Sequence, residues 1–541
     1  MADPVEHAAG PPPARRPVLR TTGANLVAEP PNSEVGGDAA SGTRDGSPRA
    51  PRPGFQEDAA DGGASSPPPG LPASYRRPLA IAVVVALALP AVHGALWLTR
   101  PAVAESSRTT ASGPAVTPSS SSSASSSASA PAGGRASTAR EVPAPATAVV
   151  TELLQRRARA VAERDRSAWL STVDRNVPSV AAVQAALFDR LATVRPSSWS
   201  YELLPPDVQL TAAQRAALPP GAVLEHVRLT YRLAPTAPEI THEQHLTLVH
   251  RASWLVGGTD AGPQQPDLWD LGPVTVARGT RSVVVAAAGS QVPQAQTAAE
   301  ADAAAARVDA VWGRGWPRTA VVFVPRDTKG MASLLGRSST AGLDQLAAVT
   351  TGESVGGAVR TSGDRIVLNP AGFAGLTPTG RSAVLTHELT HVATRATSRT
   401  TPPRWVDEGF ADYVAYLGTS LRPRDLAADV LSSPAALRAL HDLPTDQQFD
   451  PTTGRVGAAY AEAWLAMRFI AQHGGSARVV DFYRVATGLP ALRTWPPNQL
   501  PTTPRPPTTA LERACVEVLG YVEPSFVRRW VAYVRAVAAV R

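Results

Sequence analysis

The chain has 541 residues, which is too long for one ordinary domain, so two or three folded units are expected. Its formal net charge of +7 is spread along the chain without a Lys/Arg block, which argues against nucleic-acid binding. Cys515 is the single cysteine, so an intramolecular disulfide and a four-cysteine zinc site are excluded. The basic residues are almost all arginine, a bias typical of GC-rich coding, and an actinobacterial source is expected.

The N-terminal part predicts a tail and a membrane anchor. Residues 1–75 are rich in Pro, Gly, Ala and Asp, which indicates a disordered cytoplasmic tail. Segment 78–99 contains "LAIAVVVALALPAVHGALWL", about twenty residues without a formal charge, enough to cross a bilayer as a helix. Arg76 and Arg77 precede it and Arg100 alone follows it, so the positive-inside tendency places the rest of the chain outside the cell membrane. The alternative is a cleaved signal peptide ending at "AVA" (102–104), which the long leader disfavours.

Residues 100–145 are a Ser/Ala/Pro-rich linker that cannot bury a core. The first folded region, 146–290, begins with the amphipathic segment "TAVVTELLQRRARAVAERD", and a second helix is expected around 180–194. Strand-like runs follow, among them "AVLEHVRLTYRLA", "THEQHLTLVHRASWLVG" and "GTRSVVVAAAG". Helices followed by an antiparallel sheet predict an α+β accessory domain, which on element order resembles the cystatin-like cone of nuclear-transport-factor-type domains.

The accessory region contains a histidine pair in "HEQH" that superficially resembles a metal motif. Its surroundings alternate as a strand does, and a three-residue separation on a strand sends His242 and His245 to opposite faces. A shared metal ion is therefore not expected there, and a structural role is preferred.

The second folded region, 295–541, predicts a mainly helical domain with a small sheet, so the fold class of the whole chain is α+β. "AQTAAEADAAAARVDAVWG" is a strong helix by propensity, and "TAVVFVP" and "DRIVLNP" are strands. The final helix, in "EPSFVRRWVAYVRAVAAV", is expected to pack on this domain, with contact to a membrane surface as the alternative.

The stretch "SAVLTHELTHVAT" carries the chemistry of this region. A helix start is indicated by Thr377-Pro378, with a capping hydroxyl and a proline at the first helical position. His387 and His391 lie at i and i+4 on one helix face, so both imidazoles can reach one ion at about 2 Å. Glu388 lies about a third of a turn round the helix, close enough to touch a metal-bound water.

A third ligand must come from elsewhere in the chain. The variant with glycine and a third histidine in the same run is excluded, because Thr394 and Thr397 occupy those positions. A second helix, "PPRWVDEGFADYVAYLG", follows, with Glu408 and Asp412 four residues apart on one face.

These two helices resemble those of the gluzincins, the metallopeptidases that include thermolysin and the membrane-alanyl-type aminopeptidases. Within this group the resemblance is to the peptidase MA-like family. Trp405, Glu408, Gly409 and Ala411 match every fixed position of the family's "Trp-x-x-Glu-Gly-x-Ala" pattern. The resemblance implies that Glu408 is the third zinc ligand and that Asp412 braces His387. Sixteen residues separate His391 from Glu408, fewer than in the alanyl aminopeptidases, so exopeptidase specificity is not carried over.

Three protein ligands leave a fourth position on Zn²⁺ for water, which is typical of a catalytic site. Glu388 would take the proton of that water and deliver it to the leaving amine. The resemblance implies Tyr460, near the start of the helix in "GAAYAEAWLAMRFIAQHGG", as the oxyanion donor; a packing role is the alternative, and His441 and His473 are weaker candidates. The strand "RIVLN" is expected to hold an extended peptide by strand addition.

The sequence thus predicts a membrane-anchored, extracytoplasmic zinc endopeptidase that acts on peptide or protein substrates. The alternative is a catalytically silent zinc-binding envelope sensor or interaction protein with a peptidase-like fold, which the intact Glu388 disfavours. Intramembrane proteolysis is excluded, because Arg381 and Arg395 make the motif helix too polar for a lipid-facing span.

Overall fold

The computed structural model describes residues 83–85, 144–206, 215–216, 218–258, 266–354, 361–450, 453–496 and 506–540. The predicted disordered tail (1–75), the linker up to residue 143 and most of the predicted membrane segment (78–99) lie outside these ranges. Within that segment, β1 (Val83–Val85) is a strand where a helix was predicted, in keeping with the preference of consecutive β-branched valines for extended backbone. None of the helices in the described ranges combines the length and the apolar character needed to cross a bilayer.

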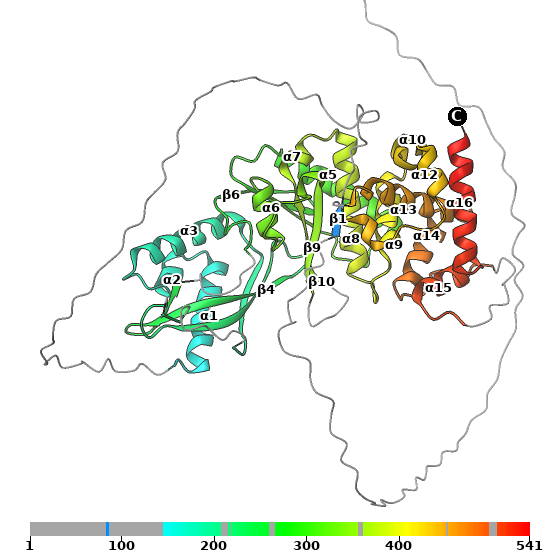
Figure 1. Ribbon diagram of the computed structural model, residues 1–541. Helices are drawn as coiled ribbons and strands as arrows, with labels where there is room; N and C mark the ends of the chain where they lie inside the picture. The colour runs from blue at the N-terminus through cyan, green and yellow to red at the C-terminus, as the bar shows by residue number, and fades with distance from the viewer. Residues whose placement is uncertain are drawn as a thin grey trace, which may run out of the picture. The chain divides into compact units, whose positions relative to one another are not determined.

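The accessory region consists of helices followed by an antiparallel sheet, as the sequence predicted (Figure 1). Its helices are α1 (Thr147–Glu163), α2 (Arg166–Ser171) and α3 (Pro178–Val194). The sheet has the order β2-β3-β4-β5, with bounds Ser198–Leu203, Val223–Arg232, Ile240–His250 and Trp254–Gly258. Buried residues of α1, Val150, Leu153 and Leu154, pack on Val227 and Leu246 of the sheet, so the apolar stripe read from the sequence covers one sheet face.

A second sheet has the order β1-β9-β10-β8-β7-β6. Its further strands are β6 (Val274–Arg278), β7 (Ser282–Ala287), β8 (Ala320–Val324), β9 (Ala348–Ser354) and β10 (Thr361–Leu368). β7, β8 and β10 run parallel, and α5 (Gln294–Trp312) connects β7 to β8. β6 and β7 therefore belong with the metal-motif region, although the sequence suggested a division after residue 290. The valines of β7 are buried, and the helix α5 packs on this strand.

The position of β10 in this sheet differs from the sequence-based expectation. β10, which contains "RIVLN", lies between β9 and β8, so both of its edges are already paired. The expectation that this strand receives a peptide is therefore wrong. β9 is paired with β10 on one side, and on its other side β1 is its partner within the described residues.

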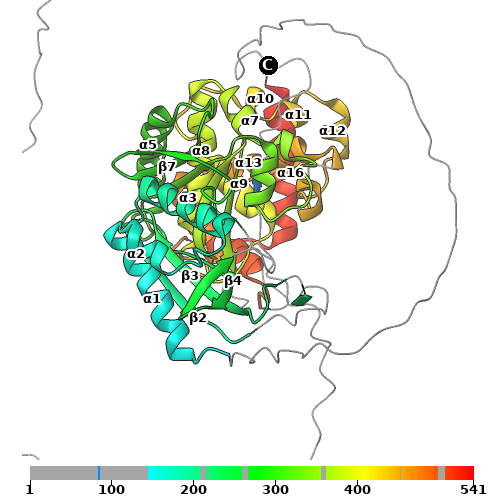
Figure 2. The ribbon, with the colours of Figure 1, turned by 90° about the vertical axis from the view of Figure 1, so that its left-hand side faces the viewer.

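The remaining elements are helical and surround the motif helix α8 (Pro378–Arg395). α8 packs on α5 and on α9 (Arg404–Tyr416), and α9 packs in turn on α13 (Val456–Ala471) (Figure 2). A Cβ at Gly409 would lie 2.6 Å from the carbonyl oxygen of Ala463, so glycine permits this close approach of α9 and α13. The other helices are α6 (Thr328–Leu334), α7 (Pro370–Ala374), α10 (Pro423–Leu426), α11 (Ala428–Leu431), α12 (Pro434–Ala439), α14 (Gly475–Ala486) and α15 (Ala510–Ala514), with short turns η3 (Leu343–Gln345), η4 (Asp446–Phe449) and η6 (Cys515–Leu519).

The C-terminal helix α16 (Glu523–Ala539) packs against α11 and α13. Phe526, Trp530 and Val534, which share one helical face, are fully buried there. The packing role predicted for this helix is the one that the structure describes.

Candidate metal centre

The motif helix α8 is buried along most of its length although it carries many polar residues. Thr377 caps it by accepting a hydrogen bond from the Gly380 amide at 3.2 Å. The hydroxyls of Thr386 and Thr390 donate to the carbonyl oxygens one turn earlier, at 2.7 and 2.8 Å. Because these hydroxyls are satisfied within the helix, α8 can be buried between the sheet and α9 at little polar cost.

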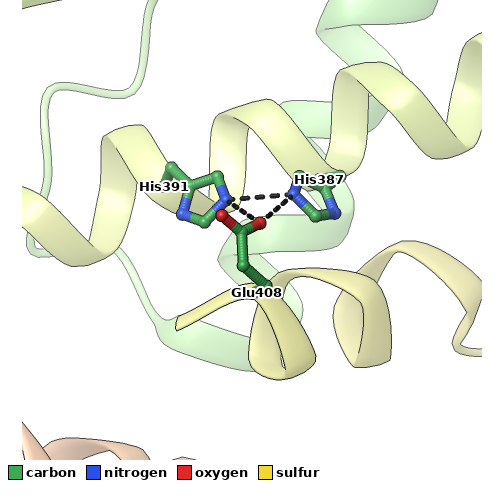
Figure 3. Close-up of side chains that lie close together, drawn as sticks. All are labelled: His387, His391 and Glu408. Atoms are coloured by element: carbon green, nitrogen blue, oxygen red, sulfur yellow. Dashed lines mark hydrogen bonds and ion pairs between the residues drawn. The ribbon is translucent and has the colours of Figure 1, made fainter. Parts of the chain in front are cut away.

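Three side chains from α8 and α9 converge on one point (Figure 3). The Nε2 atoms of His387 and His391 lie 3.0 Å apart. Oε2 of Glu408 lies 3.3 Å from the first and 3.4 Å from the second. All three residues are buried, with 1% exposure or less. Two imidazoles one turn apart on α8 and a carboxylate on the next helix therefore face a single position.

The donor atoms fit a small divalent cation. Ligands held tetrahedrally at about 2.0–2.1 Å from Zn²⁺ are about 3.3 Å from one another, close to the three distances found here. Oε2 of Glu408 is buried and makes no hydrogen bond to any described residue. A buried carboxylate oxygen without a hydrogen bond is costly unless a cation or a proton completes its environment. Two imidazole nitrogens and one carboxylate oxygen are typical zinc donors with a position left open.

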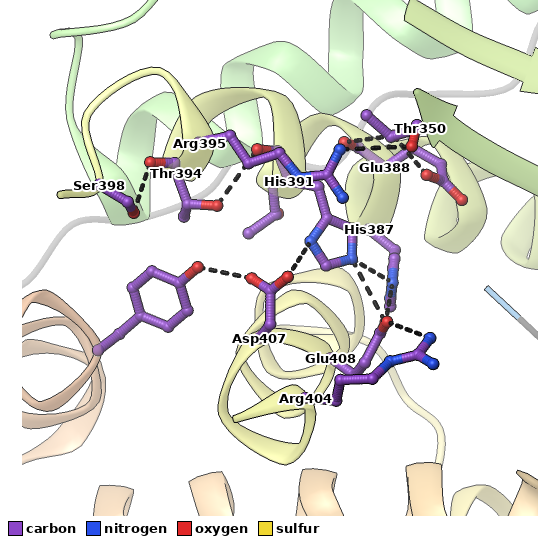
Figure 4. Close-up of polar contacts among 12 residues, drawn as sticks. Thr350, His387, Glu388, His391, Thr394, Arg395, Ser398, Arg404, Asp407 and Glu408 are labelled. Carbon is purple, nitrogen blue, oxygen red and sulfur yellow. Dashed lines mark hydrogen bonds and ion pairs between the residues drawn. The ribbon is translucent and has the colours of Figure 1, made fainter. Parts of the chain in front are cut away.

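A carboxylate lies on the far side of each imidazole, and the one beside His387 is hydrogen-bonded to it. Oδ1 of Asp412 lies 2.8 Å from Nδ1 of His387, so this nitrogen donates and Nε2 is left as the donor toward a metal. Oδ2 of Asp407 lies 3.4 Å from Nδ1 of His391, and the hydroxyl of Tyr483 donates to the other oxygen of Asp407 at 2.6 Å (Figure 4). Asp412 was expected from the family resemblance, whereas Asp407 was not expected, and its place directly before Glu408 was the available signal.

Glu388 lies beside the three ligands and points toward the sheet. The Thr350 hydroxyl of β9 donates to its Oε2, while its Oε1 is buried and makes no hydrogen bond to a described residue (Figure 4). Burial raises the pKa of the Glu388 carboxyl. The two histidines and the hydrogen bond from Thr350 act in the opposite direction and lower this pKa, but burial outweighs them. One oxygen is thus anchored, and the other has no hydrogen-bond partner among the described residues.

The charges around the site favour a cation at the point of convergence. Burial lowers the pKa of His387, but Asp412 and Glu408 outweigh burial and raise it to about 10. Burial raises the pKa of Glu408, but both histidines outweigh that effect and lower it to about 2. Without a metal the carboxylates therefore draw protons onto the histidines, and a divalent cation would replace that positive charge.

Of the candidate oxyanion donors, the structure brings only Tyr460 to this site. Its ring centroid lies 6.4 Å from that of His387, and it packs edge-on to Phe449 at 5.2 Å. His441 and His473 are both exposed, and His441 lines a different hollow beside Glu523. The position of Tyr460 is compatible with its predicted role and also with the packing alternative.

The histidines of the "HEQH" stretch do not converge. His245 stacks on His226 of the neighbouring strand, with ring centroids 5.0 Å apart. His242 instead lies edge-on to Tyr231, and its Nε2 is 3.6 Å from Oδ2 of Asp267. Among the described residues, the group of potential metal ligands is the one formed by α8 and α9.

No family model matches the chain, and no curated protein matches it. Solved structures of mutant M1 zinc metallopeptidases do match. A two-domain M1 zinc metallopeptidase bound to L-arginine is 17% identical to this chain, with a TM-score of 0.28. The match covers 64% of this chain and 72% of the metallopeptidase. Another, from Deinococcus radiodurans, is 16% identical with a TM-score of 0.26, over 62% and 72%. One from the same bacterium bound to a Tyr-Ser-Ala substrate is 17% identical with a TM-score of 0.26, over 62% and 61%. TM-scores this low leave the functional inference to the geometry of the site.

Proposed function

We propose that the chain is a zinc-dependent peptidase whose metal is held by His387, His391 and Glu408. The observation that supports this most strongly is the convergence of two Nε2 atoms and one carboxylate oxygen within 3.0–3.4 Å of one another. When bound there, zinc supplies a Lewis acid that acidifies water and polarises an amide carbonyl.

The chain's own residues supply the remaining chemistry. Glu388 accepts a proton through its free Oε1 while Thr350 holds Oε2, and it returns the proton to the leaving amine. Asp412 keeps His387 in the tautomer with Nε2 unprotonated. Tyr460 is the proposed donor to the developing oxyanion, from the helix that packs on α9.

The substrate is proposed to bind as an extended strand along β9. Thr350 of β9 contacts Glu388, so a peptide on the outer edge of β9 passes the proposed proton acceptor. β1 pairs antiparallel with this edge and places Val83 opposite Thr350, so the edge accepts a strand, and a substrate bound there would replace β1. Cleavage within a chain and an extracytoplasmic site are parts of the proposal drawn from the sequence.

The test compares the full chain with Glu388→Gln, each analysed for zinc content and incubated with a broad peptide library. We expect about one zinc per chain in both and cleavage by the parent alone, with the variant reduced by about 10²–10⁴-fold. Zinc in both with no cleavage by either would support the alternative of a silent envelope sensor. Absence of zinc from the parent would refute the proposed function.

A further inference from the structure

Arg404 lies next to the proposed metal centre. It is the first residue of α9, one turn before Glu408, and its Nη2 is 3.5 Å from Oε1 of Glu408 (Figure 4). Its guanidinium lies over the ring of Phe449 at 5.5 Å, and its backbone amide donates to Asp446 at 2.8 Å. The backbone of Arg404 is therefore held by the turn η4, and its guanidinium lies between Phe449 of that turn and Glu408 of α9.

The two oxygens of Glu408 face different partners. Oε2 faces the two histidine nitrogens, at 3.3 and 3.4 Å, whereas Oε1 faces the guanidinium of Arg404. The glutamate is 1% exposed and the arginine side chain is 30% exposed. A guanidinium stays charged at any ordinary pH. Arg404 therefore attracts Oε1 of Glu408 whether or not the neighbouring groups gain or lose a proton.

The guanidinium has hydrogen-bonding capacity to spare. Its Nη2 is buried and makes no hydrogen bond to any described residue, and its separation from Oε1 is that of an ion pair. A small rotation of Glu408 on binding a cation through Oε2 would close this gap. An unused buried donor directed at the second oxygen of a proposed ligand is otherwise unexplained.

We propose that Arg404 is a positioning residue that occupies Oε1 of Glu408, so that only Oε2 is offered to the metal. This role rests on the proposed function, because it acts through the zinc ligand. A carboxylate that can bind a metal through only one oxygen leaves room at the metal for water and for the substrate carbonyl. The contact between Phe449 and Tyr460 links the arginine to the proposed oxyanion donor on the same side of the site.

The test measures zinc dissociation constants by competition with a chromophoric chelator, together with kcat and KM on a cleaved peptide. Arg404→Met is expected to weaken zinc binding about tenfold and to lower kcat more than it changes KM. Arg404→Lys keeps the charge and the stem, and is expected to recover part of that loss in both quantities. It also tests the role should the methionine variant fold poorly.

Arg422→Met is the matched control, because Arg422, directly before α10, also pairs with a carboxylate three residues later, that of Asp425, which is not a proposed metal ligand. It is expected to leave zinc binding and turnover unchanged. Zinc affinity of both Arg404 variants within about twofold of the parent would overturn the positioning role and leave the proposed function intact. An equal loss in Arg422→Met would overturn it too, since the effect would then be general.

Discussion

The helix α8 and the strand β4 each carry a glutamate directly after a histidine, with a second histidine close behind. On α8 the helical turn brings His387 and His391 to one face, and their Nε2 atoms lie 3.0 Å apart. On β4 the alternation of side chains separates His242 from His245, and each contacts a different neighbour. Residue types and spacing acquire chemical meaning only through the period of the backbone that carries them.

The carboxylates around the two histidine pairs also differ. Beside α8, the histidines outweigh burial and hold the pKa of Glu408 down to about 2, so it is a ready metal ligand. Beside β4, burial raises the pKa of Asp267 to about 6 against the opposing charge of Arg365. The position of Glu408 thus favours the anion and that of Asp267 disfavours it, although burial also raises the pKa of Asp412 and Glu388 beside α8.

The largest effect on zinc binding is expected from removing a histidine of the α8 pair, and removal of a histidine of the β4 pair is the control. His387→Ala should weaken zinc binding by more than about 100-fold, beyond the range for residues that only orient ligands. His242→Ala should leave zinc binding unchanged, because no described group of metal ligands includes it. Chelator competition on the two variants checks this; a loss of zinc by His242→Ala would contradict the comparison.

A smaller effect is expected from the residues that orient the histidines. Asp412→Asn removes the charged partner of His387 Nδ1 at 2.8 Å and should weaken zinc binding about 10–100-fold. Asp267→Asn makes the corresponding change beside His242 and should have no effect on zinc. Isothermal titration with zinc measures both, and equal affinities for the Asp412 variant and the parent would show that the brace is dispensable.

A weaker contribution is expected from Asp407, whose oxygen lies 3.4 Å from Nδ1 of His391. Asp407→Asn should weaken zinc binding by less than Asp412→Asn, about tenfold or below, because the contact of Asp407 with His391 is an ion pair without a hydrogen bond. Tyr483→Phe removes the hydroxyl that holds Asp407 and should cause a similar or smaller change. A larger loss for Asp407→Asn than for Asp412→Asn would reverse this ranking.

The sequence was most informative where a local period and a fixed pattern coincide. The helix from Pro378, the cap at Thr377 and the four residues His387, Glu388, His391 and Glu408 all follow from helical spacing and motif. Two features depended on long-range pairing that local patterns do not contain. One is the place of β10 inside the sheet, and the other is the membership of β6 and β7 in that sheet. Asp407 was missed because a single acidic residue on a helix is usually solvated.

The last expected effect concerns stability and not zinc binding, namely the pH dependence of stability near β4. The folded-state pKa of Asp267, about 6, lies above its usual 3.8, so its contribution is fully present below pH 3.8 and is lost as pH rises through 6. Asp267→Asn keeps an acceptor for Tyr231 but cannot ionise. Relative to the parent it should gain about 1–3 kcal/mol of stability between pH 4 and pH 8.

Urea unfolding of the metal-free chain and its Asp267→Asn variant at a series of pH values checks this prediction. Asp270, whose pKa burial also raises to about 6, remains in both proteins, so part of the slope should persist in the variant. Identical slopes for the parent and the variant would show that Asp267 does not ionise at a cost to the fold.

The most direct measurement is anomalous diffraction at the zinc edge from a crystal of the zinc-loaded chain. We expect one strong peak within about 2.0–2.2 Å of the Nε2 atoms of His387 and His391 and of Oε2 of Glu408. A peak beside His242 or His245, or no peak between α8 and α9, would contradict the assignment of this site as the metal centre.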